Sequence, residues 1–305
     1  MSAARKLARS VLLALLCALG CVSPCLAGQF RYCDPPTELN ATQQDTLLRF
    51  GAVIKSTLES TGQRLALVSR SGLDLSRFDM RYSHAGISLR AHPTGPWTVR
   101  QLYFDCDERR PRIFDQGIAG FLVGSGDPSI GYFSVVLLPG ADLDIERVTL
   151  DNGRALGLLG AQYSANAYAF GQQYQNCNQW VAEMMAVGWG NLKDSTQLRS
   201  QAQQWLQGAG YEPARFEVGN SVLMWLGGVL PWLHRDDHPQ DDLEQWRFRV
   251  SMPQSIESFA RARVPGAQRI EFCHANRRIV IRQGWEPIAP GCTPNESDTV
   301  ITLDS

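Results

Sequence analysis

Residues 175–185 read QNCNQWVAEMM and place a cysteine at the head of an apolar helical stretch. Apolar residues follow Cys177 after three, four, seven and eight positions, the spacing that gives one face of a helix. These residues are Trp180, Val181, Met184 and Met185. Gly188 and Gly190 predict the end of the helix.

A thiol in a first helical turn faces unpaired backbone N–H groups and the positive end of the helix dipole. Both stabilise a thiolate, so we expect Cys177 to have a pKa below the roughly 8.5 of a free thiol. Attack of the Cys177 sulfur on a carbonyl carbon also needs a base. Residues 81–89, RYSHAGISL, place His84 at the start of a short strand. We interpret Cys177 and His84 as a catalytic pair; a buried, inert Cys177 is the alternative.

A third residue would orient the imidazole, as in other nucleophile–base sets. Residues 82–89 and 97–104 predict a β-hairpin, because residues 91–96 between them are rich in turn formers. Gln101 and Asp105 share one face of the second strand. Gln101 is our prediction for the orienting residue, with Asp105 as the alternative.

The first 27 residues have the pattern of a secretory signal peptide. Basic residues at positions 5, 6 and 9 precede an apolar run over residues 11–20, and residues 25–27, CLA, suit cleavage before Gly28. This predicts export to the periplasm; a lipoprotein anchored at Cys21 is the alternative. No other segment has the roughly twenty apolar residues of a membrane helix.

Removal of residues 1–27 takes away three basic and no acidic residues, which leaves 26 basic against 30 acidic residues and a net charge of −4. This balance argues against a nucleic-acid partner. Residues 28–305 are expected to form a single catalytic domain with a C-terminal extension from about residue 195.

Five cysteines remain after residue 27: Cys33, Cys106, Cys177, Cys273 and Cys292. An exported protein tends to oxidise its cysteines in pairs, so an odd number predicts one free thiol. Cys273 and Cys292 close a short loop, and Cys33 with Cys106 is a second plausible pair. Cys177 would then be free, although sequence alone does not fix the connectivity.

Further helices and strands follow from hydrophobic periodicity and turn residues. We predict helices over 41–61, 148–159 and 255–263, a short helix and a loop over 112–126, strands over 65–69, 132–138 and 246–252, and a hairpin of 269–273 with 277–283.

Residues 222–233, VLMWLGGVLPWL, are too few to span a membrane. They predict a buried core helix; a lid, a substrate groove or a membrane-surface contact is the alternative. The acidic loop that contains His234 and His238 matches no zinc motif, so no metal is expected. His92 and His274 are expected at the surface.

The SHAGI strand at residues 83–87, the polar residue on the next strand and the NCNQ helix start at 176–179 resemble the circularly permuted NlpC/P60 group of papain-like cysteine hydrolases. In that group the histidine precedes the cysteine. The whole chain further resembles DUF2145, an exported bacterial family thought to belong to the group. Relatives place glutamate, histidine or another polar residue where this chain has Gln101.

The resemblance implies an α+β fold, with an antiparallel sheet or half-barrel packed on the Cys177 helix, and it implies no cofactor. Candidates for an oxyanion-hole side chain are Gln172, Gln173 and Tyr174, beside the backbone N–H of Cys177. The expected function is a cysteine hydrolase, an amidase or peptidase, acting on cell-wall peptides or other amides. The alternatives are an acyltransferase or lipid-amide or ester hydrolase with the same pair, and a non-enzymatic envelope protein.

Overall fold

The computed structural model describes residues 39–123, 127–219 and 232–303. The predicted signal peptide, Cys21, Cys33 and most of the apolar segment 222–233 lie outside these residues. Within the described part of the chain, no helix has the length and apolar character needed to cross a membrane.

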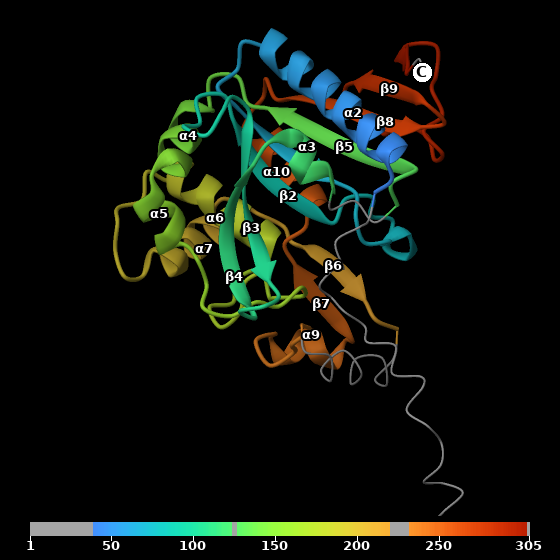
Figure 1. Cartoon of the computed structure of the whole chain (residues 1–305). Coiled ribbons are helices and arrows are strands. Elements are labelled where there is room, and N and C mark those ends of the chain that lie inside the picture. Colours follow the sequence, from blue (N-terminus) through green and yellow to red (C-terminus); the bar gives the residue numbers. More distant parts are fainter. Residues whose placement is uncertain (1–38, 124–126, 220–231, 304–305) are drawn as a thin grey trace, which may run out of the picture. The chain divides into compact units, whose positions relative to one another are not determined.

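An eight-stranded sheet forms the centre of the fold, in the order β10-β9-β8-β5-β1-β2-β3-β4 (Figure 1). Every neighbouring pair is antiparallel. The strands are β1 (Leu65–Arg70), β2 (His84–Leu89), β3 (Thr98–Asp105), β4 (Arg110–Gln116), β5 (Ile130–Leu137), β8 (Gln268–Ala275), β9 (Arg278–Gln283) and β10 (Thr299–Thr302). Strands β6 (Ala214–Glu217) and β7 (Arg247–Val250) pair separately. The predicted α+β class with a large antiparallel sheet is confirmed.

Helices cover both faces of the sheet, and β1 shows why. Its residues alternate between two apolar clusters: Leu65 and Leu67 contribute to one, while Ala66 and Val68 contribute to the other. Helices α2 (Ala41–Ser60) and α3 (Ile118–Val123) pack in the second cluster. The first cluster takes α4 (Leu143–Leu150), α5 (Asn152–Gly157), α6 (Cys177–Trp189), α7 (Leu198–Gly208) and α10 (Pro253–Arg263). A 3-10 turn, η1 (Ser76–Phe78), and α9 (Gln240–Glu244) complete the elements.

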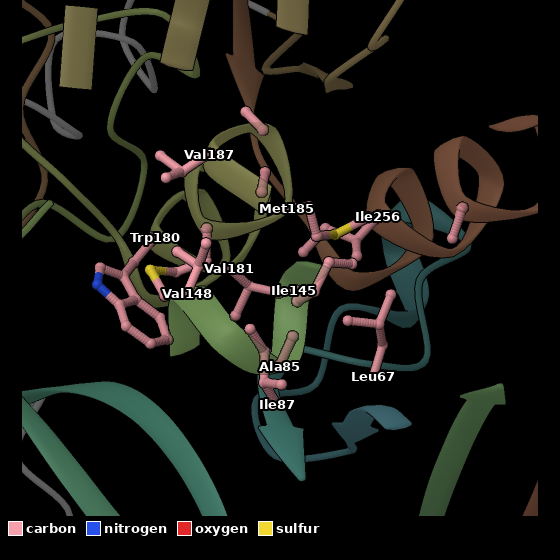
Figure 2. Packing of buried hydrophobic residues seen from close by; sticks show 14 of the residues in the cluster. Leu67, Ala85, Ile87, Ile145, Val148, Trp180, Val181, Met185, Val187 and Ile256 are labelled. Carbon is pink, nitrogen blue, oxygen red and sulfur yellow. The ribbon is translucent and has the colours of Figure 1, made fainter. Parts of the chain in front are cut away.

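Helix α6 is buried along most of its length against this first face. Figure 2 shows Trp180, Val181 and Met185 beside residues of β2 and α4. Trp180 is fully buried and its indole N–H donates to the carbonyl of Ala155 at 3.2 Å. The helix therefore has a fixed position relative to the strand that begins at His84.

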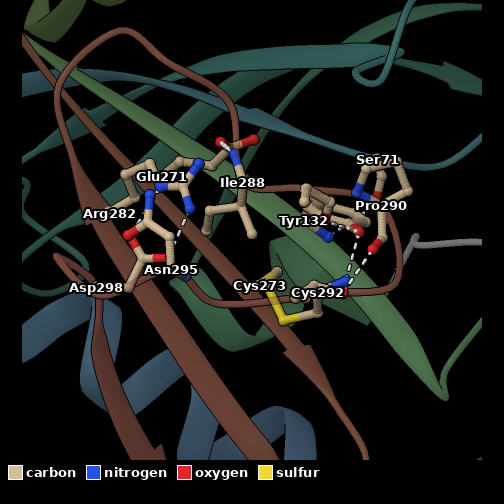
Figure 3. The surroundings of a disulfide bond; sticks show 12 residues. Ser71, Tyr132, Glu271, Cys273, Arg282, Ile288, Pro290, Cys292, Asn295 and Asp298 are labelled. Carbon is tan, nitrogen blue, oxygen red and sulfur yellow. Dashed lines mark hydrogen bonds and ion pairs between the residues drawn. A yellow bond between two sulfur atoms is a disulfide. The ribbon is translucent and has the colours of Figure 1, made fainter.

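The C-terminal strands extend the main sheet, because β8 pairs with β5 over its whole length. A disulfide joins Cys273 of β8 to Cys292, as predicted (Figure 3). The Cys292 N–H also donates to the hydroxyl of Tyr132 on β5 at 2.9 Å. Cys106 is disulfide-bonded, and the predicted partner, Cys33, is outside the described residues. Cys177 has a free thiol, as predicted.

Two predicted elements differ from the structure. Of the region 112–126, predicted as a short helix and a loop, residues 118–123 form the helix α3, but residues 110–116 form the strand β4, because a tight turn with Arg109 at φ 53° returns the chain along β3. Pro111 is tolerated there since β4 is an edge strand. The helix predicted over 148–159 is two helices, α4 and α5, separated at Asp151, whose side chain caps α5.

The prediction that His92 and His274 lie at the surface is wrong: they are 6 % and 2 % exposed. His92 contacts Arg100 and Asp115 on β3 and β4. His274 points from β8 towards α2, where its ring lies 4.8 Å from that of Phe50. Turn and strand-end positions suggested exposure, but packing between the sheet and neighbouring segments buries both rings.

Burial lowers the pKa of His274 to about 4, although Asp127 opposes this shift. As the pH falls below about 6.5, the unfolded chain binds a proton at this position and the folded chain does not until near pH 4. We therefore expect the free energy of unfolding to fall by about 2–3 kcal/mol between pH 6.5 and 4 through this residue. Urea unfolding of the wild type and of His274→Gln across this range measures it. Parallel pH curves for the two proteins would contradict the assignment.

Candidate active site

Cys177 is the first residue of α6, as the sequence predicts. Asn176 is the N-cap: its backbone is extended and its side chain accepts the Gln179 N–H at 2.7 Å. The Asn176 amide also donates to the carbonyls of Ala165 and Ser251 at 3.3 Å. These bonds fix the point at which the helix begins. The thiol of Cys177 therefore lies in the first helical turn, in a side chain only 6 % exposed.

Asn178 joins the start of α6 to the start of β2. Its side-chain oxygen accepts the Ala85 N–H at 2.9 Å, and its amide nitrogen donates to the Ser83 carbonyl at 3.2 Å. The residue after Cys177 thus holds the residues on both sides of His84. Cys177 and His84 are separated by 93 positions in the sequence, and the Asn178–Ala85 bond links the residues that follow each of them.

Gln101 bonds to the His84 ring. Its side-chain oxygen bonds to Nε2 of His84, and its amide nitrogen donates to Gln116 on β4 at 2.8 Å. With the NH2 group directed at Gln116, the amide oxygen faces the ring, an arrangement that suits the Nε2–H tautomer. The other ring nitrogen, Nδ1, is then the basic one. Asp105, the alternative, accepts the N–H groups of Asp107 and Glu108 and caps the β3–β4 turn.

Arg70 is a component of the site that sequence reasoning missed. It ends β1 directly opposite His84 in the β1–β2 register and is only 8 % exposed. Phe121 of α3 contacts both residues: its ring centre is 5.4 Å from the Arg70 guanidinium and 5.5 Å from the His84 ring. The only available signal was a basic residue directly after the apolar run 65–69.

The pKa values of Cys177 and His84 differ from those expected for a thiolate at position 177. Burial raises the pKa of Cys177 to about 11, although Arg70 and the backbone N–H groups of Asn178, Cys177 and Ala85 lower it. Burial, together with Arg70, lowers the pKa of His84 to about 3, against the hydrogen bond to Gln101. The expectation of a low thiol pKa is therefore wrong: desolvation outweighs the helix terminus. Near neutral pH the pair consists of a neutral thiol and a neutral imidazole.

Each of the three predicted oxyanion-hole side chains binds another group in the fold. Gln172 donates to Gln203, and Gln173 and the Tyr174 hydroxyl both bind Asp236. The groups that act on the sulfur are instead the backbone N–H groups of Cys177, Asn178 and Ala85. Donors of this kind stabilise negative charge in acyl transfer.

A buried ion pair supports the loop that leads into Cys177. Glu183, on α6, is fully buried and binds Arg199 of α7 at 3.1 and 3.2 Å. The same carboxylate accepts amide N–H groups of Gln175 and Gln203 at 2.6 and 2.7 Å. Arg199 also donates to the carbonyls of residues 171, 172 and 174. The apolar spacing of α6 gave no sign that Glu183 faces inward.

The acidic loop near His238 uses its carboxylates within the fold. Asp242 binds Arg247 and Arg249, and Asp237 accepts the Tyr168 N–H at 2.9 Å. Among the described residues, no group of three or more His, Cys, Asp or Glu side chains is arranged to hold a metal.

The structure is an α+β protein in which a helix-initial cysteine and a strand-initial histidine are both buried, and Asn178 links the two elements that begin with them. Residues 57–260, 204 of the 305, match the DUF2145 family, described as an uncharacterized protein conserved in bacteria. The chain belongs to this family. No curated protein and no solved structure matches it.

Proposed function

We propose that the protein is a cysteine hydrolase in which Cys177 attacks an amide or ester carbonyl and His84 transfers the proton. The observation that carries this proposal is the two hydrogen bonds from the Asn178 side chain to backbone groups of Ser83 and Ala85, which flank His84. These bonds link the start of the helix that carries a free thiol to the start of the strand that carries an imidazole bonded to Gln101. Nucleophile, base and orienting residue come from three separate segments, the arrangement that nucleophilic catalysis requires.

In the proposed reaction the Sγ–C bond forms as the thiol proton moves to Nδ1 of His84. The carbonyl electron pair moves to oxygen, where the backbone N–H groups of Cys177 and Asn178, in the first turn of α6, stabilise it. Collapse breaks the C–N or C–O bond, and the leaving group takes the proton from His84. Water then attacks the thioester, His84 accepts its proton and returns it to sulfur as the acid is released.

The resting charges support a general-base step instead of a preformed ion pair. A thiol with a pKa of about 11 and an imidazole with a pKa of about 3 hold very little thiolate–imidazolium pair at neutral pH. The proton therefore moves as the sulfur attacks. Slow reaction with simple alkylating reagents is expected, and faster reaction with a carbonyl bound in the site.

The order of histidine before cysteine, and a nucleophile helix packed on an antiparallel sheet, support the permuted NlpC/P60-like arrangement as part of this proposal. With the signal peptide proposed at residues 1–27, the protein would act in the periplasm. Cell-wall peptides are then the substrate class we favour. Transfer to another acceptor, or action on lipid amides or esters, uses the same chemistry.

A second candidate function is a non-enzymatic envelope protein. It is favoured by one observation: Cys177 and His84 are 6 % and 9 % exposed, so the described conformation gives a substrate little access to either. An active enzyme must open this site during turnover.

Hydrolysis by purified residues 28–305 separates these candidates. The panel contains muropeptides, a p-nitrophenyl ester and a lipid amide, each tested with the wild type and with Cys177→Ala. We expect muropeptide cleavage that falls at least about 10³-fold in the variant. Preferred cleavage of the lipid amide would select the alternative substrate. Cleavage that persists in Cys177→Ala, or none by the wild type, would contradict the proposal.

A further inference from the structure

We propose that Arg70 supplies the positive charge that stabilises the Cys177 sulfur as it becomes anionic, so that His84 enters the reaction uncharged. This inference deepens the proposed function and rests on it for its catalytic meaning. Arg70 is a positioning residue, because it acts through the field that it places on the sulfur and the imidazole.

The geometry fixes Arg70 beside the pair. It occupies the β1 position directly opposite His84, and both side chains are at least nine-tenths buried. The Phe121 ring contacts both the guanidinium and the imidazole. Leu67 and Val68, on the same strand, are buried on opposite faces of the sheet, so β1 cannot shift without disturbing both apolar clusters. The charge is therefore held in place.

Within the described residues, the other side chains that contact His84 or its flanking backbone in these bonds and ring contacts are neutral. They are Gln101 of β3, Asn178 of α6 and Phe121 of α3. Among the described residues, Arg70 is the charged group that acts on both Cys177 and His84. A charge in a site with little water acts more strongly than the same charge at a surface. Arginine keeps its charge when buried, which lysine does less reliably.

The pKa values of Cys177 and His84 distinguish an electrostatic role of Arg70 from a purely structural one. Arg70 lowers the pKa of both the thiol and the imidazole, so its removal should raise both. Opening the site to solvent would instead lower the thiol pKa and raise that of the imidazole, because it relieves desolvation. The direction of the thiol pKa therefore distinguishes loss of charge from loss of structure.

The test uses the full mature chain with Arg70→Gln, Arg70→Met and Arg70→Lys. Alkylation of Cys177 by iodoacetamide is followed against pH, and His84 is titrated by NMR. Either neutral variant should alkylate about threefold to tenfold more slowly at pH 8.5, with its pH–rate profile moved to higher pH. The His84 pKa should rise in the same protein. Arg70→Lys should restore most of both properties.

Arg147→Gln, at an exposed ion pair on α4, is the matched control and should change neither property. Faster alkylation in Arg70→Gln and Arg70→Met, or unchanged pKa values, would overturn the proposal. Neither readout requires turnover. If the two titrations behave as expected and no substrate is cleaved, the hydrolase proposal fails while the electrostatic assignment stands.

Discussion

Replacing His84 with alanine is expected to lower the rate of hydrolysis by about 10²- to 10⁴-fold, the usual contribution of a positioned general base. The loss should be large because the thiol pKa of about 11 leaves almost no thiolate without a base. Cys177 itself keeps its place, since Asn178 bonds to backbone groups of residues 83 and 85 and not to the imidazole. Initial rates on the substrate found in the panel measure the effect.

Gln101 offers the matched comparison. Gln101→Ala should cost less than His84→Ala, because the ring loses its orientation but remains in place. Gln101→Glu keeps an oxygen acceptor for Nε2–H and should retain most of the activity. Equal rates for the wild type and His84→Ala would remove His84 from the mechanism. Inactivity of Gln101→Glu in a folded protein would show that the amide does more than accept this bond.

Replacing Glu183 with alanine is expected to lower the free energy of unfolding by about 3–5 kcal/mol. The change leaves the guanidinium of Arg199 without its buried carboxylate and leaves two amides, of Gln175 and Gln203, without their acceptor. Gln175 lies two residues before Cys177 and also accepts the Gly160 N–H. Hydrolysis should therefore fall along with stability. Urea unfolding of the wild type and the variant measures the loss.

Two further variants test whether loss of the Glu183–Arg199 ion pair causes this loss of stability. Glu212→Ala, which removes an exposed carboxylate, should cost less than about 0.5 kcal/mol. The double variant Glu183→Leu, Arg199→Met should be less destabilised than the sum of its single changes, because no charge is then left unpaired. A loss below about 1 kcal/mol for Glu183→Ala would mean that water reaches this network in the native state.

The sequence was informative wherever local periodicity coincided with packing. The apolar spacing after Cys177 predicted a helix with this cysteine at its head, as in α6. The turn-rich residues 91–96 predicted the β2–β3 hairpin, and strand alternation then placed Gln101 near His84. Each of these features depends on a few neighbouring residues, so it can be derived without knowing the fold.

What could not be predicted depends on long-range burial. Arg70 is part of the site only because β1 pairs with β2, and Glu183 faces Arg199 only because α7 packs on α6. The predicted direction of the shift in the Cys177 pKa was wrong for the same reason. A helix start favours a thiolate locally. Whether the Cys177 pKa is raised or lowered depends on how deeply the sulfur is buried, and the sequence does not show the depth of burial.

Covalent labelling of Cys177 by a peptidyl acyloxymethyl ketone tests the central claim most directly. The mature protein is treated at pH 7.5, with iodoacetamide as the simple reagent for comparison, and labelled peptides are mapped by mass spectrometry. The account predicts labelling at Cys177, far faster than by iodoacetamide, that falls at least about 100-fold in His84→Ala. Labelling of Cys177 only after the protein is unfolded, or at the same rate without His84, would contradict a catalytic Cys177–His84 pair.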